Sequence, residues 1–155
     1  MRFLAKTAGM ILFILAAAGP VALLGQDLRV EYVNHPAEAA LGLPFSSVVR
    51  VGDMLYLSGM VGVSALDSME LVPGGMPAEA RQALENIEAI LAYVGAGRED
   101  IVKCTVMLDD IGRWSEFNEV YVEFFGSHRP ARSAFGADGL ALGAAVEIEC
   151  MAVAP

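Results

Sequence analysis

Apolar and polar positions along the chain predict a series of short strands and two long helices. Residues 45–51 and 54–59 are rich in β-branched and other apolar side chains. They flank Gly52-Asp53, and a two-residue connection of this kind between β-rich segments is typical of a hairpin. The first predicted unit is therefore a β-hairpin, followed by a turn-rich loop at residues 71–75.

The next segment has the spacing of an amphipathic helix. Pro77 suits the first turn of a helix, and Gly95 and Gly97 suit its end. Apolar residues recur between these limits at helical spacing, and polar residues occupy the positions between them. The apolar set is Ala80, Ala83, Leu84, Ile87, Ile90, Leu91 and Val94, and the polar set is Glu79, Arg81, Gln82, Glu85 and Glu88.

The second half of the chain predicts a strand, a helix and two more strands. Residues 101–108 form a continuous apolar run, as expected of a buried strand. A second helix should begin near Ser115 and end at Gly126, and residues 132–138 and 145–153 should be the last two strands. The aromatic stripe of this helix is interpreted as core: Trp114, Phe117, Val120, Tyr121, Phe124 and Phe125.

This order predicts an α+β domain in which two helices cover one face of a mixed sheet. Two helices cannot cover both faces. The strands are nevertheless apolar on both, because the positions of Ile101 and Met107 alternate with those of Val102, Val106 and Leu108. A second covering is required, and self-association would supply it.

The beginning of the chain resembles a secretory signal peptide. Arg2 and Lys6 precede a stretch without charge over residues 8–25, and a helix-breaking Gly-Pro pair falls late in that stretch. This pattern suits a signal better than a membrane-spanning helix, which needs about 20 apolar residues. An uncleaved N-terminal anchor is the alternative, and the protein would contact a membrane only in that case.

Cleavage after Ala18 and cleavage after Gly25 both remain open. We expect residues 1–25 to be the leader or anchor and residues 26–155 to be the functional domain. Both alternatives place that domain outside the cytoplasm, in the periplasm or secreted.

The charge of the chain disfavours nucleic acid as a partner. The whole chain has 10 Lys and Arg against 19 Asp and Glu, and two of the positive charges lie in the leader, so the domain carries −11. A surface this acidic repels phosphate backbones, and no Lys/Arg cluster offsets it.

The two cysteines and two histidines lack the spacing of a metal site, and we predict no metal. Cys104 and Cys150 could pair in an oxidising compartment if their strands are neighbours. We favour the alternative, in which both are buried free thiols that act as small apolar residues.

Two charged residues stand on segments that are otherwise typical of buried strands. Arg132 lies in His128-Arg129-Pro130-Ala131-Arg132-Ser133, and Glu147 lies in Val146-Glu147-Ile148-Glu149. Buried Arg and Glu are rare unless paired or functional. Because arginine is well shaped to bind a carboxylate, the first hypothesis is a small anionic substrate with a carboxylate that acts on a proton or a water. We interpret Glu149 as structural, a candidate partner for Lys103.

Over residues 30–153 the chain resembles the RidA (YjgF) family of reactive-intermediate deaminases. Six strings in the family's order carry the resemblance: Val51-Gly52-Asp53-Met54-Leu55-Tyr56-Leu57-Ser58-Gly59, Ala80-Arg81-Gln82-Ala83-Leu84-Glu85-Asn86-Ile87, Ile101-Val102-Lys103-Cys104-Thr105-Val106, Phe117-Asn118-Glu119-Val120-Tyr121, Arg129-Pro130-Ala131-Arg132-Ser133 and Val146-Glu147-Ile148-Glu149.

The resemblance implies a chorismate-mutase-like fold and a barrel-like homotrimer with clefts between subunits. It implies hydrolysis of reactive enamines and imines, such as 2-aminoacrylate, to a 2-keto acid and ammonia, with no cofactor. By the same resemblance Arg132 binds the substrate carboxylate and Glu147 holds the attacking water. The remaining residues that it places at the cleft are Phe45, Ser58, Gly59, Ser133 and Ala134.

Three positions depart from the family's usual residues. Phe45 replaces a tyrosine whose hydroxyl touches the ligand, Met60 replaces a common glutamine, and Ala134 replaces a cysteine or threonine. A lost hydrogen bond to a charged group costs about 1.5–3 kcal/mol. A weaker or altered substrate preference is therefore expected.

Two alternatives remain beside the deaminase. A protein that binds small carboxylates without turnover would keep the Arg132 motif. Endoribonuclease or translation-inhibitor activity is also attached to this family, but the acidic charge and the leader argue against it.

Overall fold

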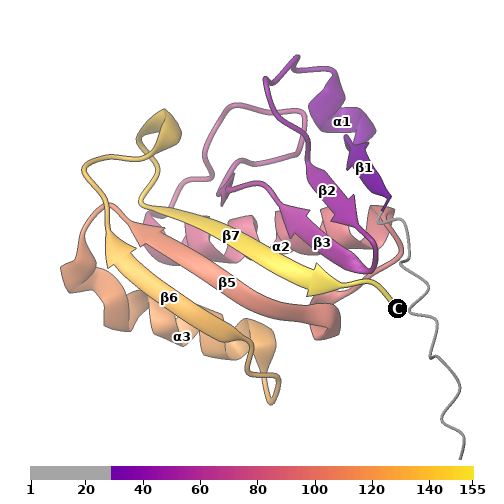
Figure 1. The fold of residues 1–155 in the computed structure, drawn as a ribbon. Helices are drawn as coiled ribbons and strands as arrows, with labels where there is room; N and C mark the ends of the chain where they lie inside the picture. The colour runs from indigo at the N-terminus through magenta and orange to yellow at the C-terminus, as the bar shows by residue number, and fades with distance from the viewer. Residues whose placement is uncertain (1–28) are drawn as a thin grey trace, which may run out of the picture.

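Seven strands and two long helices form two layers in the computed structural model, which describes residues 29–155 (Figure 1). The strands are β1 (Val30–Val33), β2 (Val48–Val51), β3 (Met54–Leu57), β4 (Met60–Val61), β5 (Ile101–Leu108), β6 (Ala131–Gly136) and β7 (Val146–Val153). The sheet order is β1-β2-β3-β7-β5-β6, and β4 pairs with β7. Only β5 and β6 run parallel, so the sheet is mixed, as predicted.

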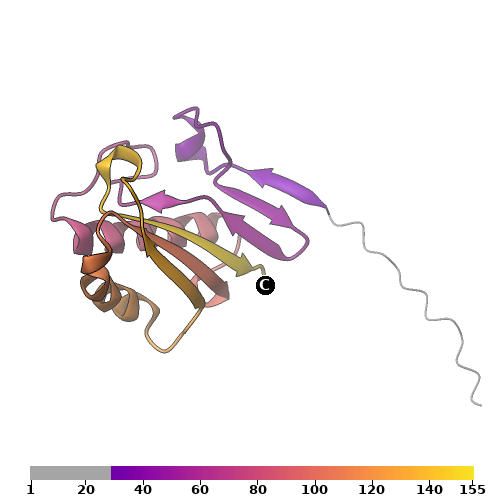
Figure 2. The ribbon, with the colours of Figure 1, turned by 60° about the vertical axis from the view of Figure 1, so that its left-hand side comes forward.

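The two long helices, α2 (Met76–Tyr93) and α3 (Trp114–Phe125), lie on the same face of the sheet (Figure 2). The core forms between this face and the helices. Leu84 and Ile87 of α2, Phe117 of α3, and Val106 and Ile148 of the sheet are all fully buried. Burying a side chain of this size stabilises the fold by about 1.5–3 kcal/mol. Hydrophobic burial therefore fixes which face of each strand points toward the helices.

The predicted hairpin and helix ends are confirmed. β2 and β3 pair across Gly52-Asp53, and Gly52 adopts the positive φ of 59° that such a turn requires. Helix α2 begins one residue before Pro77 and ends at Tyr93.

Three small elements were missed by the sequence patterns. β1 and β4 are too short to show a period, and the four-residue helix α1 (Pro36–Ala39) depends on its cap. His35 supplies that cap, because its Nδ1 accepts a hydrogen bond from the Ala37 N–H at 3.3 Å. This short helix matters because it forms one wall of the cavity described below.

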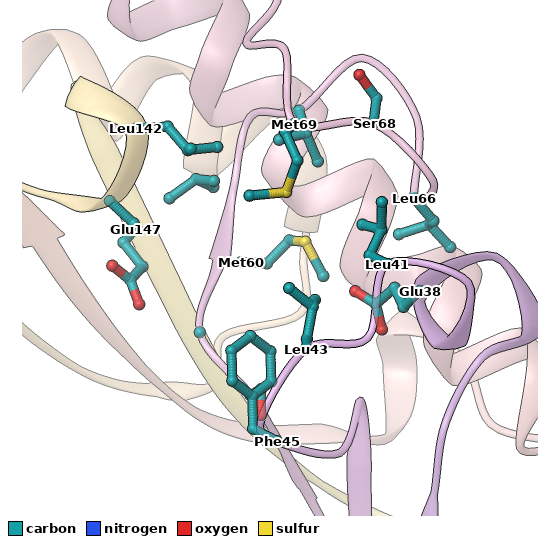
Figure 3. A pocket seen from close by; sticks show the side chains of 15 residues that line it. Glu38, Leu41, Leu43, Phe45, Met60, Leu66, Ser68, Met69, Leu142 and Glu147 are labelled. Atoms are coloured by element: carbon teal, nitrogen blue, oxygen red, sulfur yellow. The ribbon is translucent and has the colours of Figure 1, made fainter.

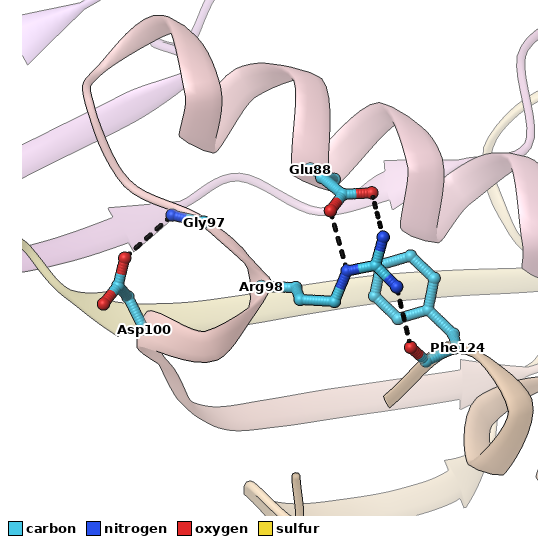
Figure 4. A network of polar contacts seen from close by, with 5 residues as sticks. All are labelled: Glu88, Gly97, Arg98, Asp100 and Phe124. Atoms are coloured by element: carbon cyan, nitrogen blue, oxygen red, sulfur yellow. Dashed lines mark hydrogen bonds and ion pairs between the residues drawn. The ribbon is translucent and has the colours of Figure 1, made fainter. Parts of the chain in front are cut away.

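An arginine joins the two long helices at one end of the core (Figure 4). Arg98 follows α2, and its guanidinium binds both carboxylate oxygens of Glu88 at 2.7 and 3.0 Å. It also donates to the Phe124 carbonyl at 3.0 Å and lies 4.6 Å from the centre of the Phe124 ring. These contacts join the C-terminal end of α3 to α2.

The two cysteines form a disulfide, so the expectation of free thiols is wrong. Cys104 of β5 and Cys150 of β7 are direct partners in the antiparallel ladder, with their Cα atoms 4.1 Å apart. Both are almost completely buried beneath the helices. The pairing depends on strand order and register, neither of which the spacing of the cysteines reveals.

The other sheet face carries large apolar side chains that no helix of the described residues covers. Tyr32, Tyr56, Phe135 and Val153 are all exposed, with Tyr32 at 74%. In the strand register these residues lie on the face opposite the buried Cys104–Cys150 pair. The predicted second apolar face is therefore present and open.

Within residues 29–155, no helix is long and apolar enough to cross a membrane. The predicted leader, residues 1–25, lies outside the described part of the chain.

Candidate active site

A cavity of about 460 Å³ lies beside β7 and contains Glu147 (Figure 3). Its walls come from α1 and the segment after it, the β3–β4 junction, the loop after β4, the turn before β7, and β7 itself. Three of the residues predicted for the site, Phe45, Ser58 and Gly59, line it together with Glu147. The remaining labelled lining residues are Glu38, Leu41, Leu43, Met60, Leu66, Ser68, Met69 and Leu142.

A β-bulge places Gly59 against Glu147. Tyr56 pairs with Met151 and Met60 pairs with Ile148, so β3 and β4 use four steps where β7 uses three. The extra residue falls at Ser58-Gly59, where the strand is interrupted. A Cβ at position 59 would overlap Oε1 of Glu147 and lie 3.0 Å from its Cδ. The absence of a side chain at Gly59 leaves room for the Glu147 carboxylate in its present position, and a larger residue there would displace it.

The neighbouring hydroxyl stabilises the same interruption. Ser58 Oγ donates to the Ser46 carbonyl at 2.7 Å, and the Ser58 N–H donates to the Ser47 carbonyl at 3.1 Å. These bonds connect the bulge to the strand that follows Phe45. Phe45 itself is half exposed at the rim of the cavity.

The environment of Glu147 disfavours its ionised form. Partial burial raises the pKa of its carboxyl above the usual range, and the charge of Glu149, two residues along on the same face, raises the pKa further. The salt bridges of residues 29–155 do not include the expected Lys103–Glu149 pair. A carboxylate with a raised pKa is suited to accept a proton from water.

Two polar side chains from α2 position the cavity wall. Glu79 and Asn86 are both more than 90% buried. Oε2 of Glu79 accepts the Ala145 N–H at 2.7 Å, just before β7, and Asn86 Nδ2 donates to the Val63 carbonyl at 2.9 Å. The helical pattern placed Glu79 on the outer face, and that assignment is wrong. Only the packing of the turn before β7 onto α2 gives this carboxylate a buried partner.

Arg132 lies on β6, outside the cavity. Its guanidinium carbon is 4.6 Å from the ring centre of Tyr121, 5.6 Å from that of Phe117 and 5.7 Å from that of Trp114. Cations bind favourably over aromatic faces at such distances. Arg132 forms no salt bridge within residues 29–155. The aromatic rings of α3 thus hold a guanidinium whose charge no carboxylate of the described chain neutralises.

Arg132 and Glu147 project from opposite faces of the sheet. Arg132 is the ladder partner of Cys104, which in turn opposes Cys150. Glu147 is three residues before Cys150, and an odd separation reverses the face. Ala134 shares the face of Arg132, whereas Ser133 lies on the open face. A single chain therefore separates the predicted site into one group around Glu147 and another around Arg132.

Leu142 has a backbone conformation that leucine rarely adopts. It lies in the turn before β7, and its φ of 61° and ψ of 7° are left-handed. Among residues 29–155 it is the only residue other than glycine with a positive φ. Such a conformation costs about 1–3 kcal/mol and is concentrated at functional sites. This backbone places an apolar side chain at the wall of the cavity (Figure 3).

No group of three or more potential metal ligands occurs in the part of the chain that the structure describes.

The fold and site together define a class of protein: a mixed-sheet α+β domain with two helices on one face and a carboxylate at a strand bulge. Residues 36–154 match the family model described as Endoribonuclease L-PSP. The chain belongs to this family, to which the six motifs had pointed under the name RidA.

Relatives over most of the chain agree with this assignment. A cattle (Bos taurus) protein named 2-iminobutanoate/2-iminopropanoate deaminase is 45% identical over 117 residues, which cover 76% of this chain and 84% of that protein. The mouse (Mus musculus) protein of the same name is 43% identical over 126 residues, 81% of this chain and 92% of its own. The crystal structure of RidA from the Antarctic bacterium Psychrobacter sp. PAMC 21119 aligns with a TM-score of 0.68 at 33% identity, covering 83% and 98% of the two chains.

We expect the Glu147 carboxyl to titrate above the ordinary glutamate pKa of about 4.3, because burial and Glu149 both disfavour its charge. The Glu149→Gln substitution should lower the pKa of Glu147, whereas Glu31→Gln, on the distant edge strand β1, should not change it. Carbon-detected NMR titration of the side-chain carboxyls measures both. A Glu147 titration that is indifferent to Glu149→Gln would contradict the coupling.

Proposed function

We propose that this protein hydrolyses reactive imines, and the enamines that tautomerise to them, to 2-keto acids and ammonia. The observation that carries this proposal is the carboxylate of Glu147, held against Gly59 at the wall of a substrate-sized cavity. The cattle and mouse relatives named as imino-acid deaminases support it. The reaction needs no cofactor, because an imine is already an activated electrophile.

Arg132 binds the substrate carboxylate in this proposal. The aromatic rings of α3 restrict the guanidinium while its N–H groups remain available. A bidentate pair with a carboxylate adds two charge-assisted hydrogen bonds and fixes the orientation of the substrate. Such orientation supplies much of the rate when the electrophile is reactive.

Glu147 orients a water and accepts its proton. The water oxygen attacks C2, and the C2=N bond becomes a single bond in a tetrahedral amino alcohol. Glu147 then returns its proton to the nitrogen, the C2–N bond breaks and ammonia leaves, and the hydroxyl loses its proton as the C2=O bond forms. Because Glu147 acts in its ionised form, the rate falls as the pH decreases through its raised pKa.

We further propose that the site is completed between chains of a homotrimer. One observation supports this arrangement in particular: Arg132 and Glu147 lie on opposite sheet faces of one chain, yet one substrate must meet both. The open face, on which Tyr56 and Phe135 are exposed, also supports self-association, because large exposed apolar side chains on one sheet face are typical of interfaces.

Export of the domain is part of the same proposal. The leader pattern at residues 1–25 supports it. The Cys104–Cys150 disulfide adds support, because disulfides persist in oxidising compartments and are rare in the cytosol.

Replacement of either charged residue should abolish most of the activity. We expect Arg132→Ala and Glu147→Gln each to lower kcat/KM by about 100-fold or more, given the usual worth of charge-assisted bonds and of a general base. The assay measures the disappearance of imine made in situ by an amino-acid oxidase, corrected for spontaneous hydrolysis. Val122→Ala, on the exposed side of α3, is the control. If the native protein is stabilised by a keto acid but shows no turnover, it is a binding protein instead.

Mixed trimers test whether the site is shared between chains. Arg132→Ala chains keep Glu147, and Glu147→Gln chains keep Arg132. Random assembly from equal amounts should restore about a quarter of the wild-type sites overall, and each mixed cyclic trimer should contain one complete site of its three. Two different affinity tags isolate the mixed assemblies, and each variant assembled with itself serves as the control. Isolated mixed trimers that remain as inactive as the single variants would contradict a shared site.

Expression of the full chain in a Gram-negative host tests export. The expected product is periplasmic, begins after Ala18 or Gly25, and shows no free thiol by thiol titration under denaturing conditions. N-terminal sequencing and fractionation measure these properties. Recovery of the full-length chain in the cytoplasmic fraction with two free thiols would exclude this part of the proposal.

A further inference from the structure

The cavity beside Glu147 extends into an apolar lobe. In Figure 3, Glu147 and Glu38 lie on opposite sides of the cavity, with Met60 between them. The lining of this lobe is mainly aliphatic or thioether, with Ser68 as a polar neighbour; the apolar residues are Leu41, Leu43, Met60, Leu66, Met69 and Leu142. A three-carbon imino acid has about six heavy atoms, whereas the cavity of one chain encloses about 460 Å³, within the usual range of small-molecule sites.

Met60 and Met69 give this lobe an adaptable lining. Met60 is 6% exposed and belongs to β4, directly after the bulge that holds Glu147. Met69 is half exposed on the loop after β4. Unbranched thioether side chains fit apolar groups of varied shape. Neither offers a strong hydrogen-bond partner to a polar substituent of a ligand.

Leu142 provides a second and independent observation. Its left-handed backbone is the kind of conformation that glycine adopts without strain, yet a leucine occupies it with its side chain half exposed at the cavity. The side chain of Leu142 does not belong to the hydrophobic core. A strained backbone that presents an apolar side chain to a cavity points to contact with an apolar ligand group.

We propose that the preferred substrates are 2-imino acids with a large apolar side chain, of the size derived from leucine, methionine or phenylalanine. The reacting carbon would lie beside Glu147, and the side chain would extend past Met60 and Leu142 into the lobe. This inference rests on the proposed function and concerns only which imines are used.

Glu38, on the opposite side of the cavity, would suggest a cationic substituent instead if its carboxylate lacked a partner. It has one, because Ser47 Oγ donates to Glu38 Oε2, and the same hydroxyl accepts the His35 N–H at 2.9 Å. This buried network ties α1 to the segment before β2. The apolar side chains between Glu38 and Glu147 favour an apolar substituent, and the lysine imine in the test below measures any contribution from Glu38.

The test compares imines made in situ from alanine, leucine, phenylalanine and lysine. For the native protein we expect kcat/KM for the leucine and phenylalanine imines to exceed that for the alanine imine by about tenfold or more, the usual effect of added methylenes in an apolar pocket. Leu142→Gly and Met60→Gln should each reduce this ratio by about tenfold, mainly through the larger imines. Val122→Ala should keep the native ratio.

Leu142→Gly also separates specificity from folding. Glycine adopts the left-handed backbone without strain, so the thermal midpoint of Leu142→Gly should equal or exceed that of the native protein. The preference of this variant for large imines over small ones should nevertheless fall. Equal rates for small and large imines, or faster turnover of the lysine imine, would overturn this inference and leave the deaminase function intact. Absence of turnover with every imine would instead overturn the proposed function.

Discussion

The β-bulge that places Gly59 against the Glu147 carboxylate is the constraint on which the site depends. One extra residue between β3 and β4 creates the bulge, and the absence of a side chain at Gly59 leaves space for the carboxylate. Glu79 fixes the other end of the arrangement by binding the backbone directly before β7. Because hydrogen bonds hold both the bulge and the turn before β7 to the rest of the domain, the backbone that carries Glu147 is positioned before any substrate arrives.

The surroundings of Glu147 and Arg132 explain how each charge behaves. Glu147 is partly buried beside another carboxylate, which raises its pKa and suits it to accept a proton. Arg132 is surrounded by aromatic faces, which keep a cation in place without neutralising it. Each environment leaves a charge incompletely satisfied, and a small anionic electrophile with an attacking water would satisfy both.

Local patterns were sufficient for most elements of the fold. Turn residues and hydrophobic periodicity are local signals, because they involve only residues that are near one another in the sequence. They were sufficient for the Gly52-Asp53 hairpin, the helix that begins next to Pro77 and the strand at residues 101–108. The four-residue α1 and the two-residue β4 have no period to detect. Glu79 was misassigned for a related reason, since its partner, the Ala145 N–H, lies 66 positions away in the sequence.

The sequence by itself determined the order of the elements, the apolar character of both sheet faces and the presence of two charges on strands that should be apolar. It also pointed to the family through six short motifs. Only the tertiary structure decided that Cys104 faces Cys150, that the bulge meets Glu147, and that Arg132 projects from the other face. These outcomes depend on strand order and register, and register is set by packing across the whole sheet rather than by neighbours in the chain.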